Sequence, residues 1–133
     1  MRWLFSNPAR IDHARVVAAI ADAERQTSGE IRVLVARHRT QDPVPAAHRQ
    51  FERLGLGGVS HPRAVLIFVS PRSRRFAVVG SKAVHDACGD AFWGELAAAM
   101  GVYFKRGEFT AGLVHGIERA GTLLAAHFPP QGA

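Results

Sequence analysis

The fold of this chain depends on one stretch, Arg63-Ala-Val-Leu-Ile-Phe-Val-Ser-Pro-Arg-Ser-Arg-Arg-Phe-Ala-Val-Val-Gly80. Its apolar run, Ala64–Val69, is too short for a typical helix and rich in strand-forming residues, so it predicts a strand that is buried on both faces. The next four residues, Ser70–Ser73, have the composition of a turn. A second strand is predicted over Phe76–Val79, ending at Gly80. Because so short a turn joins them, the two strands are expected to be antiparallel.

Before this hairpin the sequence predicts two helices and one strand. Asn7 can cap a helix and Pro8 suits its first position, so a first helix is expected from there to Gln26. Residues 30–36 then predict a strand and residues 45–54 a second helix. A strand, a helix and a strand form a crossover unit, so the strands over 30–36 and 64–69 are expected to be parallel.

After the hairpin three helical segments are predicted, over residues 83–88, 90–105 and 110–127. The last contains Gly112, Gly116 and Gly121, which weaken an isolated helix and therefore indicate the close approach of a neighbouring backbone. The predicted fold class is α/β. It is a three-layer αβα sandwich in which a small mixed sheet, built from a β-α-β crossover and an antiparallel hairpin, has helices on both faces.

Composition indicates a single domain over residues 1–133, with residues 1–7 and 129–133 expected to lie loosely outside its packed part. One cysteine excludes an internal disulfide. The start lacks the apolar run of a signal peptide and no run is long enough to span a membrane, so a cytoplasmic location is predicted. The net charge of +6 comes mainly from arginine. It indicates either a genome rich in arginine codons or a polyanion partner, and no nucleic-acid motif accompanies it.

The predicted topology brings polar residues to both ends of the sheet. One end gathers carboxylates and a hydroxyl, whose oxygens suit Ca²⁺ or Mg²⁺. The candidate metal ligands there are Glu30, Ser81, Asp86 and Asp90. The alternative is that Asp86 and Asp90 only cap and charge the start of the long helix.

The opposite end is strongly cationic. The candidate anion-binding residues are Arg37, Arg39, Arg72, Arg74 and Arg75. Ligands often bind at the carboxyl ends of parallel strands, which favours a site for an anion or an acidic partner. The alternative is a solvated hairpin tip that prevents edge-to-edge aggregation.

Six segments, in this order and spacing, resemble the TPM domain, named for thylakoid-lumen, photosystem-repair and acetylcholine-receptor-modulator proteins. They are Thr27-Ser-Gly-Glu-Ile31, Ala64-Val-Leu-Ile-Phe-Val-Ser70, Phe76-Ala-Val-Val-Gly80, Phe92-Trp93, Phe104-x-x-Gly107-x-Phe-x-x-Gly-Leu113 and His127-Phe-Pro129. The resemblance covers nearly the whole chain. It implies the αβα sandwich, the acid-phosphatase activity attributed to a plant member, divalent-cation binding in some members and membrane-linked roles in others.

One departure from the family pattern concerns the metal ligands. After the glycine that ends the third strand, the family usually has aspartate, any residue and glycine, whereas this chain has Ser81, Lys82 and Ala83. Any metal or phosphate role of that aspartate is therefore in question here.

Known phosphatase motifs are absent from the sequence. Cys88 has Gly94 six positions later instead of the arginine that cradles phosphate in cysteine phosphatases. Cys88 is expected near a helix start, where a thiol pKa can fall, or else as a small buried apolar residue. His115 and Glu118 have the spacing of a di-metal motif but lack the paired partners.

Three functions remain open from the sequence. The first is a non-catalytic recognition domain for a protein, an acidic partner or an anion. The second is a metal-assisted acid phosphatase, in which Glu30 and His85 are the candidate catalytic residues and His85 donates a proton. The third is a polyanion binder that uses the arginines, with nucleic acid disfavoured as the partner.

Overall fold

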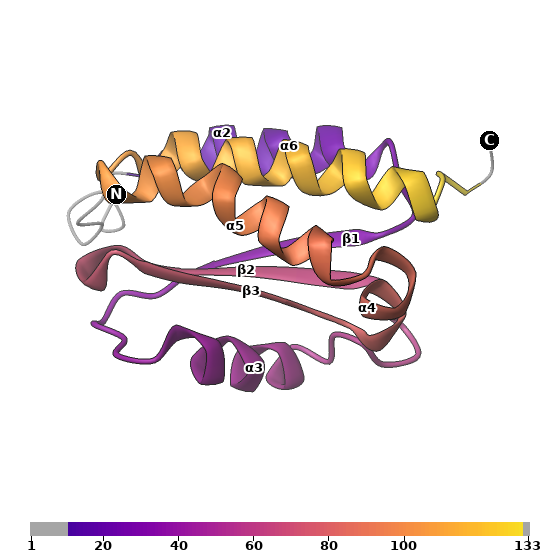
Figure 1. Ribbon diagram of the computed structural model, residues 1–133, viewed down its shortest axis with the longest axis horizontal. Coiled ribbons are helices and arrows are strands. Elements are labelled where there is room, and N and C mark those ends of the chain that lie inside the picture. Colours follow the sequence, from indigo (N-terminus) through magenta and orange to yellow (C-terminus); the bar gives the residue numbers. More distant parts are fainter. Residues whose placement is uncertain (1–10, 132–133) are drawn as a thin grey trace.

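The computed structural model describes residues 11–131 and places a three-stranded sheet between two layers of helices (Figure 1). The strands are β1 (Glu30–Val35), β2 (Ala64–Ser70) and β3 (Arg75–Gly80), in the order β1-β2-β3. As predicted, β1 and β2 are parallel and β2 and β3 are antiparallel. A short 3₁₀ helix, Pro71–Ser73, forms the hairpin turn, and Arg74 follows it in the left-handed region with φ of 51°.

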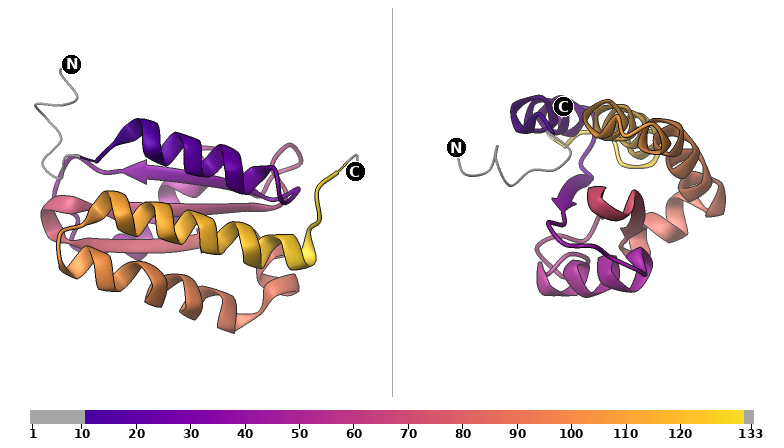
Figure 2. Two further views of the ribbon diagram at one scale, coloured as in Figure 1. Left: turned by 90° about the horizontal axis from the view of Figure 1, so that it is seen from above. Right: turned by 90° about the vertical axis from the view of Figure 1, so that its left-hand side faces the viewer.

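The described helices lie on both faces of this sheet. They are α2 (His13–Glu24), α3 (Pro43–Arg53), α4 (Lys82–Cys88), α5 (Asp90–Lys105) and α6 (Phe109–His127). Figure 1 and Figure 2 show α2, α5 and α6 together over one face, α3 alone over the other, and α4 at the end of the sheet where β3 finishes. The α/β sandwich is therefore confirmed. None of the described helices combines the length and the apolar character that crossing a membrane requires.

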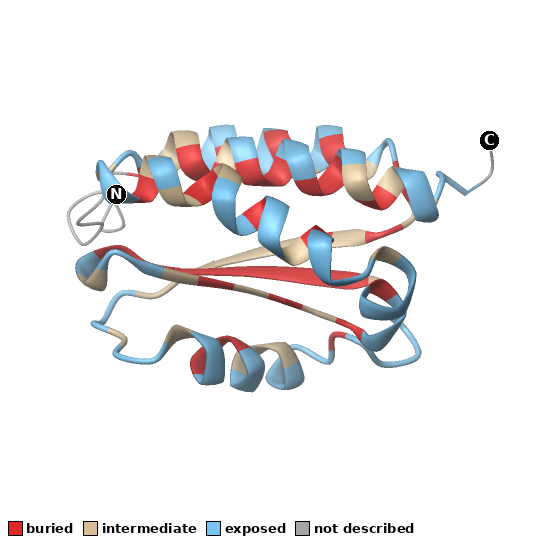
Figure 3. Cartoon of the chain, in the orientation of Figure 1, coloured by how far each residue is buried: buried red, intermediate tan, exposed pale blue. Residues whose placement is uncertain are grey.

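The core is organised on the two faces of β2, whose seven residues are all buried (Figure 3). On one face Val65, Ile67 and Val69 pack in the larger cluster, with the apolar residues of α2, α5 and α6. On the other face Leu66 and Phe68 pack in a smaller cluster with α3. The fully apolar sequence of β2 is explained by these two packed layers.

Helices α5 and α6 pack closely because glycines of α6 leave room for side chains of α5. A Cβ built on Gly112 would lie 2.5 Å from Phe104 Cε1, and one on Gly116 would overlap the Met100 sulfur. Only Gly121 faces backbone as predicted, since its Cβ would lie 3.2 Å from Ala23 Cα. At Gly112 and Gly116 the nearest atoms are side-chain atoms of α5, so the space that these two glycines leave is filled by side chains.

The first helix differs from its prediction. Its expected start at Asn7 and Pro8 lies outside the described residues, and α2 begins only at His13. Asp12 precedes it in an extended conformation, donates its N–H to Thr110 Oγ1 (3.0 Å), and accepts the Arg15 N–H at its carboxylate (3.1 Å). A single helix from Pro8 to Gln26 is therefore wrong, because Asp12 caps α2 and ties it to the start of α6.

Candidate functional site

Glu30 and Ser81 lie at the same end of the sheet, as the topology predicts. Glu30 is opposite Ala64 in the parallel ladder, and the Ser81 N–H donates to the Ala64 carbonyl at 3.0 Å. Both residues are thus next to the first residue of β2. Sharing an end does not by itself make a site, because the Glu30 carboxylate and the Ser81 hydroxyl each already have a hydrogen-bond partner in the protein.

The Glu30 carboxylate is held by two neighbours. His61 Nδ1 lies 2.8 and 3.1 Å from its two oxygens, and Arg32 Nη2 donates to it at 3.1 Å. The Glu30 side chain keeps only 26% of its exposure. Sequence reasoning did not find His61, because it lies in the loop between α3 and β2, whose conformation no periodic pattern describes.

The other candidate metal ligands are spread around α4 and the start of α5. Ser81 is buried and its Oγ accepts the Ala64 N–H at 3.3 Å. Asp86 pairs with Lys82 at 2.6 Å on the exposed side of α4, and this hydrogen bond raises the pKa of the Lys82 ammonium. Asp90 is exposed in the first turn of α5. Within residues 11–131, no three His, Cys, Asp or Glu side chains are placed to hold a metal ion.

The candidate proton donor, His85, is exposed on α4 with its ring centroid 5.0 Å from that of Trp93. It is not among the hydrogen-bond partners of Glu30. The metal site and the His85 role therefore stay predictions, and the described contacts give this end mainly a structural role.

A hydrogen-bonded latch explains the Thr27-Ser28-Gly29 segment at this end. The Phe128 carbonyl accepts from Thr27 Oγ1 and from the Ser28 N–H (3.0 Å), so the loop before β1 holds the end of α6. Arg63 reinforces the latch: its Nη1 donates to Ser28 Oγ at 3.0 Å and its guanidinium lies 5.4 Å from the centre of the Phe128 ring.

We expect Thr27→Val to lower the free energy of unfolding by about 1–2 kcal/mol, because the buried Gly29 N–H and the Phe128 carbonyl both lose a partner. Urea denaturation followed by circular dichroism measures this loss. Thr122→Val is the matched control, since the Thr122 hydroxyl is exposed and bonds only to the Glu118 carbonyl of its own helix. Equal effects of the two changes would contradict a stabilising role for the latch.

The cationic end is built by hydrogen bonds between the loop after β1 and the hairpin tip. Thr40 N donates to Ser73 Oγ at 2.9 Å, and Arg39 Nη1 donates to the Arg72 carbonyl at 3.2 Å. The Arg75 guanidinium donates to the Gln41 carbonyl. Two segments about thirty residues apart in the sequence therefore lie side by side, as the topology predicts.

Two adjoining cavities lie along this junction. One, of about 450 Å³, is lined by Arg39, Thr40, Gln41, Ser73 and Arg75. The other, of about 360 Å³, is lined by Arg39, Thr40, Gln41, Asp42, Pro45, Ala46 and Arg49. Since they share three residues, we treat them as one feature and call it the arginine cleft. Its cationic groups are Arg39, Arg49 and Arg75, and its lining also contains one carboxylate, that of Asp42.

The predicted arginines do not all reach this cleft. Arg74 turns toward α5, where its Nη1 donates to the Lys105 carbonyl at 3.2 Å. Arg37 and Arg72 are exposed nearby but line neither cavity, whereas Arg49 of α3 does and was not predicted. Arg49 was missed because it belongs to the amphipathic pattern of α3, where a charged residue on the outer face needs no explanation.

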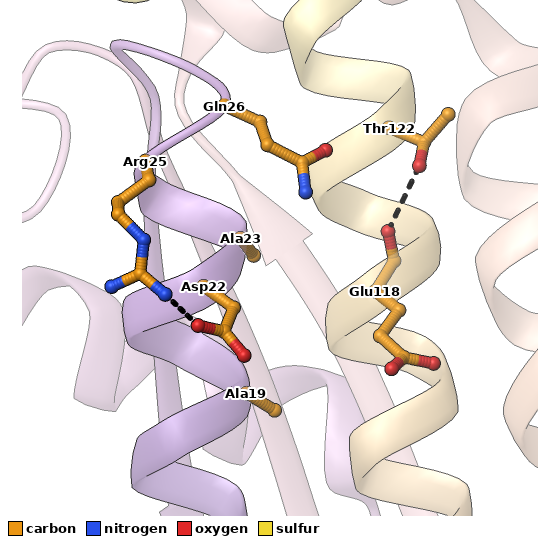
Figure 4. Close-up of a pocket in the computed structure, with 7 residues that line it drawn as sticks. All are labelled: Ala19, Asp22, Ala23, Arg25, Gln26, Glu118 and Thr122. Carbon is orange, nitrogen blue, oxygen red and sulfur yellow. Dashed lines mark hydrogen bonds and ion pairs between the residues drawn. The ribbon is translucent and has the colours of Figure 1, made fainter.

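A further groove, of about 560 Å³, lies between α2 and α6 (Figure 4). Ala19 and Ala23 form part of its wall, and Asp22 is paired with Arg25 at its rim. Glu118 also lines it, while His115 lies against the Tyr103 ring of α5, with centroids 5.4 Å apart. The spacing of His115 and Glu118 therefore does not produce a shared metal site, because the two side chains serve different helix contacts.

Cys88 is the last residue of α4 and, as predicted, lies near a helix start, because α5 begins two residues later at Asp90. Its thiol is partly buried, and this burial raises its pKa above the ordinary value for cysteine. A neutral thiol at physiological pH is a poor nucleophile, which supports the alternative of a small packing residue.

Comparison with known proteins adds a family and several structural neighbours. The family model described as TPM domain matches residues 9–123. The NMR structure of the BA42 protein from the psychrophilic bacterium Bizionia argentinensis is similar with 36% identity and a TM-score of 0.82, covering 92% of this chain and 86% of that one. No protein with a curated description matches the sequence.

Two more distant solution structures share the fold. The N-terminal domain of the cg2496 protein from Corynebacterium glutamicum has 16% identity and a TM-score of 0.70, covering 87% of this chain and 75% of that one. The N-terminal domain of a protein from P. gingivalis has 15% identity and a TM-score of 0.72, covering 89% and 78%. At such low identity these two neighbours bear on the architecture alone.

Proposed function

The chain belongs to the TPM domain family, and from that premise we propose that it is a non-catalytic recognition domain that binds anionic groups at the arginine cleft. The observation that carries the proposal is a set of oriented guanidinium groups without carboxylate partners. Among the described residues, Arg39, Arg49 and Arg75 form no ion pair, although other arginines of the chain do.

Their hydrogen bonds to backbone carbonyls orient two of these arginines without neutralising them. Arg39 and Arg75 each donate to one carbonyl, of Arg72 and Gln41, and a guanidinium has five N–H donors. The remaining donors and the full positive charge are free to meet a phosphate or a carboxylate, which the planar guanidinium can bind with two parallel hydrogen bonds.

The position of the cleft in the fold also supports recognition of a ligand. It follows the carboxyl ends of the parallel strands β1 and β2, where α/β proteins often bind ligands. Its Ser73 Oγ accepts the Thr40 N–H, and neither histidine nor cysteine is among the lining residues. These groups suit holding an anion better than attacking one.

The test is an NMR titration with inorganic phosphate and with polyglutamate. We expect the Thr40 and Gln41 amide signals to shift, and the double variant Arg39→Glu/Arg75→Glu to bind about tenfold or more weakly, since each lost charge-assisted hydrogen bond contributes about 1.5–3 kcal/mol. Binding should also weaken as salt is added, because exposed charges are screened.

The matched control is Arg15→Glu/Arg53→Glu, which changes the net charge equally at two exposed residues outside the cleft. If both double variants weakened anion binding equally, the loss would reflect the net charge of the protein and not the cleft, which would contradict the proposal. Release of phosphate from p-nitrophenyl phosphate with Ca²⁺, Mg²⁺ or Mn²⁺, abolished by Glu30→Gln, would overturn it in favour of a metal-assisted phosphatase.

A further inference from the structure

The outer edge of β1 has backbone groups that no described strand pairs. β1 lies at one end of the order β1-β2-β3. Its even-numbered residues form the hydrogen bonds to β2: the Glu30 N–H donates to the Arg63 carbonyl (2.7 Å), and the Ala36 N–H donates to the Val69 carbonyl (2.8 Å). Because donors alternate along a strand, the N–H and C=O groups of Val33 and Val35 face away from β2.

Near the start of this edge, a side chain accepts a hydrogen bond from the backbone of β1. Glu24, at the end of α2, accepts the Ile31 N–H at 2.9 Å, and no bond of this kind is found for Val33 or Val35 among residues 11–131. Figure 2, right, shows β1 at the open side of the sheet, with α2 above it and no described strand or helix beside it. A row of unpaired N–H and C=O groups is a template for another strand.

The opposite edge of the sheet is covered. A Cβ on Gly80 of β3 would overlap the Trp93 ring of α5, and Phe104 packs edge-on against Phe76 with centroids 4.8 Å apart. On β1 every residue except Ile31 is partly exposed, whereas the central strand β2 is buried throughout.

The positive charge that follows the outer edge of β1 favours an acidic partner. Arg37 follows β1 by two residues and Arg39 by four, and Arg39 opens the arginine cleft. A strand that pairs with Val33 and Val35 therefore ends near Arg37 and Arg39, neither of which forms an ion pair among the described residues. A second copy of this chain would bring a further net charge of +6 to the same place, so charge complementarity favours an acidic segment.

We propose that the outer edge of β1 binds an extended acidic peptide as a fourth strand, with its carboxylates in the arginine cleft. Main-chain hydrogen bonds to Val33 and Val35 supply the pairing, and Arg39 and Arg75 supply the preference for acidic residues. This inference rests on the proposed function, because it uses the same arginines, and it names the class of partner.

The probe is an acetylated peptide of two glutamates followed by alternating valine and threonine. At saturation we expect hydrogen exchange of the Val33 and Val35 amides to slow about fivefold or more, and Val35→Pro to weaken binding about fivefold, the loss of one hydrogen bond of about 1 kcal/mol. Val35→Thr, which keeps the N–H, is the matched control. Proline is tolerated here because the Val35 N–H takes no part in the ladder to β2.

A second measurement does not depend on the folding of the proline variant. The wild-type chain is titrated with the same peptide carrying N-methyl groups on alternate residues, in both possible registers. One register removes the donors that pair with β1 and should abolish protection of Val33 and Val35, while the other should bind as the unmodified peptide does.

The outcomes separate this inference from the proposed function. Binding that is lost with Arg39→Glu/Arg75→Glu, but not with Val35→Pro or either N-methylated peptide, would overturn the fourth strand and leave anion binding intact. Phosphate binding without peptide binding would do the same. Failure of phosphate, polyglutamate and peptide alike would overturn both. Protection of Val33 and Val35 that depends on protein concentration, without peptide, would assign the edge to a second copy and overturn the acidic partner.

Discussion

Phe104→Ala is expected to lower the free energy of unfolding by about 3–5 kcal/mol, the range for deleting a buried aromatic ring. Phe104 is 1% exposed in the last turn of α5. Its ring packs against Phe76 of β3 and is stacked on Phe109 at the start of α6, with centroids 5.4 Å apart. One side chain thus joins the sheet to two helices, and its loss leaves a cavity that three elements would have to close together. Urea denaturation followed by tryptophan fluorescence measures the change.

The control for this variant is Val102→Ala, two residues earlier in the same helix. Val102 is 53% exposed, so its truncation removes little buried surface and should change the free energy of unfolding by less than about 0.5 kcal/mol. A loss below about 1 kcal/mol for Phe104→Ala would mean that α5 does not depend on this contact, and would contradict the packing described for the larger core cluster.

The second large effect is expected from adding a single methyl group. Gly112→Ala would place Cβ 2.5 Å from Phe104 Cε1 and 3.0 Å from Tyr103 Cβ, which is closer than packed carbon atoms allow. Either α6 moves away from α5 or the Phe104 ring leaves its position. We expect a net loss of about 1–3 kcal/mol in the free energy of unfolding, although alanine is the better helix former.

Gly94→Ala is the matched control, because Gly94 lies within α5 and its added Cβ would meet no atom within 4 Å. The same methyl group should there raise the free energy of unfolding by about 0.5–1 kcal/mol. Opposite signs for the two variants are the expected result. In the background of Phe104→Leu, the cost of Gly112→Ala should fall, and an unchanged cost would show that the ring is not the group that alanine meets.

The arrangement of strands and helices could be predicted because its signals are local. Ala64–Val69 is short, apolar and followed by turn residues, and the structure makes it the buried central strand, extended only to Ser70. Helices α3 to α6 begin and end within two residues of their predicted limits. The start of α2 was missed because Asp12 is held by Thr110, a residue 98 positions away that no local pattern reveals.

The candidate sites were less predictable, since side-chain partners depend on loops. The predicted topology placed Glu30 and Ser81 at one end of the sheet. It could not show that His61 and Arg32 form hydrogen bonds with the Glu30 carboxylate. The topology also placed the hairpin tip beside the loop after β1. It could not show that Arg74 donates to the Lys105 carbonyl, or that Arg49 of α3 lines the cleft. Which arginines converge is decided by loop hydrogen bonds, and these leave no periodic signal.

The hydrogen bonds that join Thr40 to Ser73 and Arg39 to the Arg72 carbonyl have a thermodynamic consequence. Because the two walls of the cleft come from distant parts of the chain, they exist as a pair only after β1 has paired with β2. An anion that requires both walls has no affinity for the unfolded chain, so its occupancy and the folding equilibrium are linked. The melting temperature should then rise with the concentration of the anion, because the hairpin tip takes part both in folding and in anion binding.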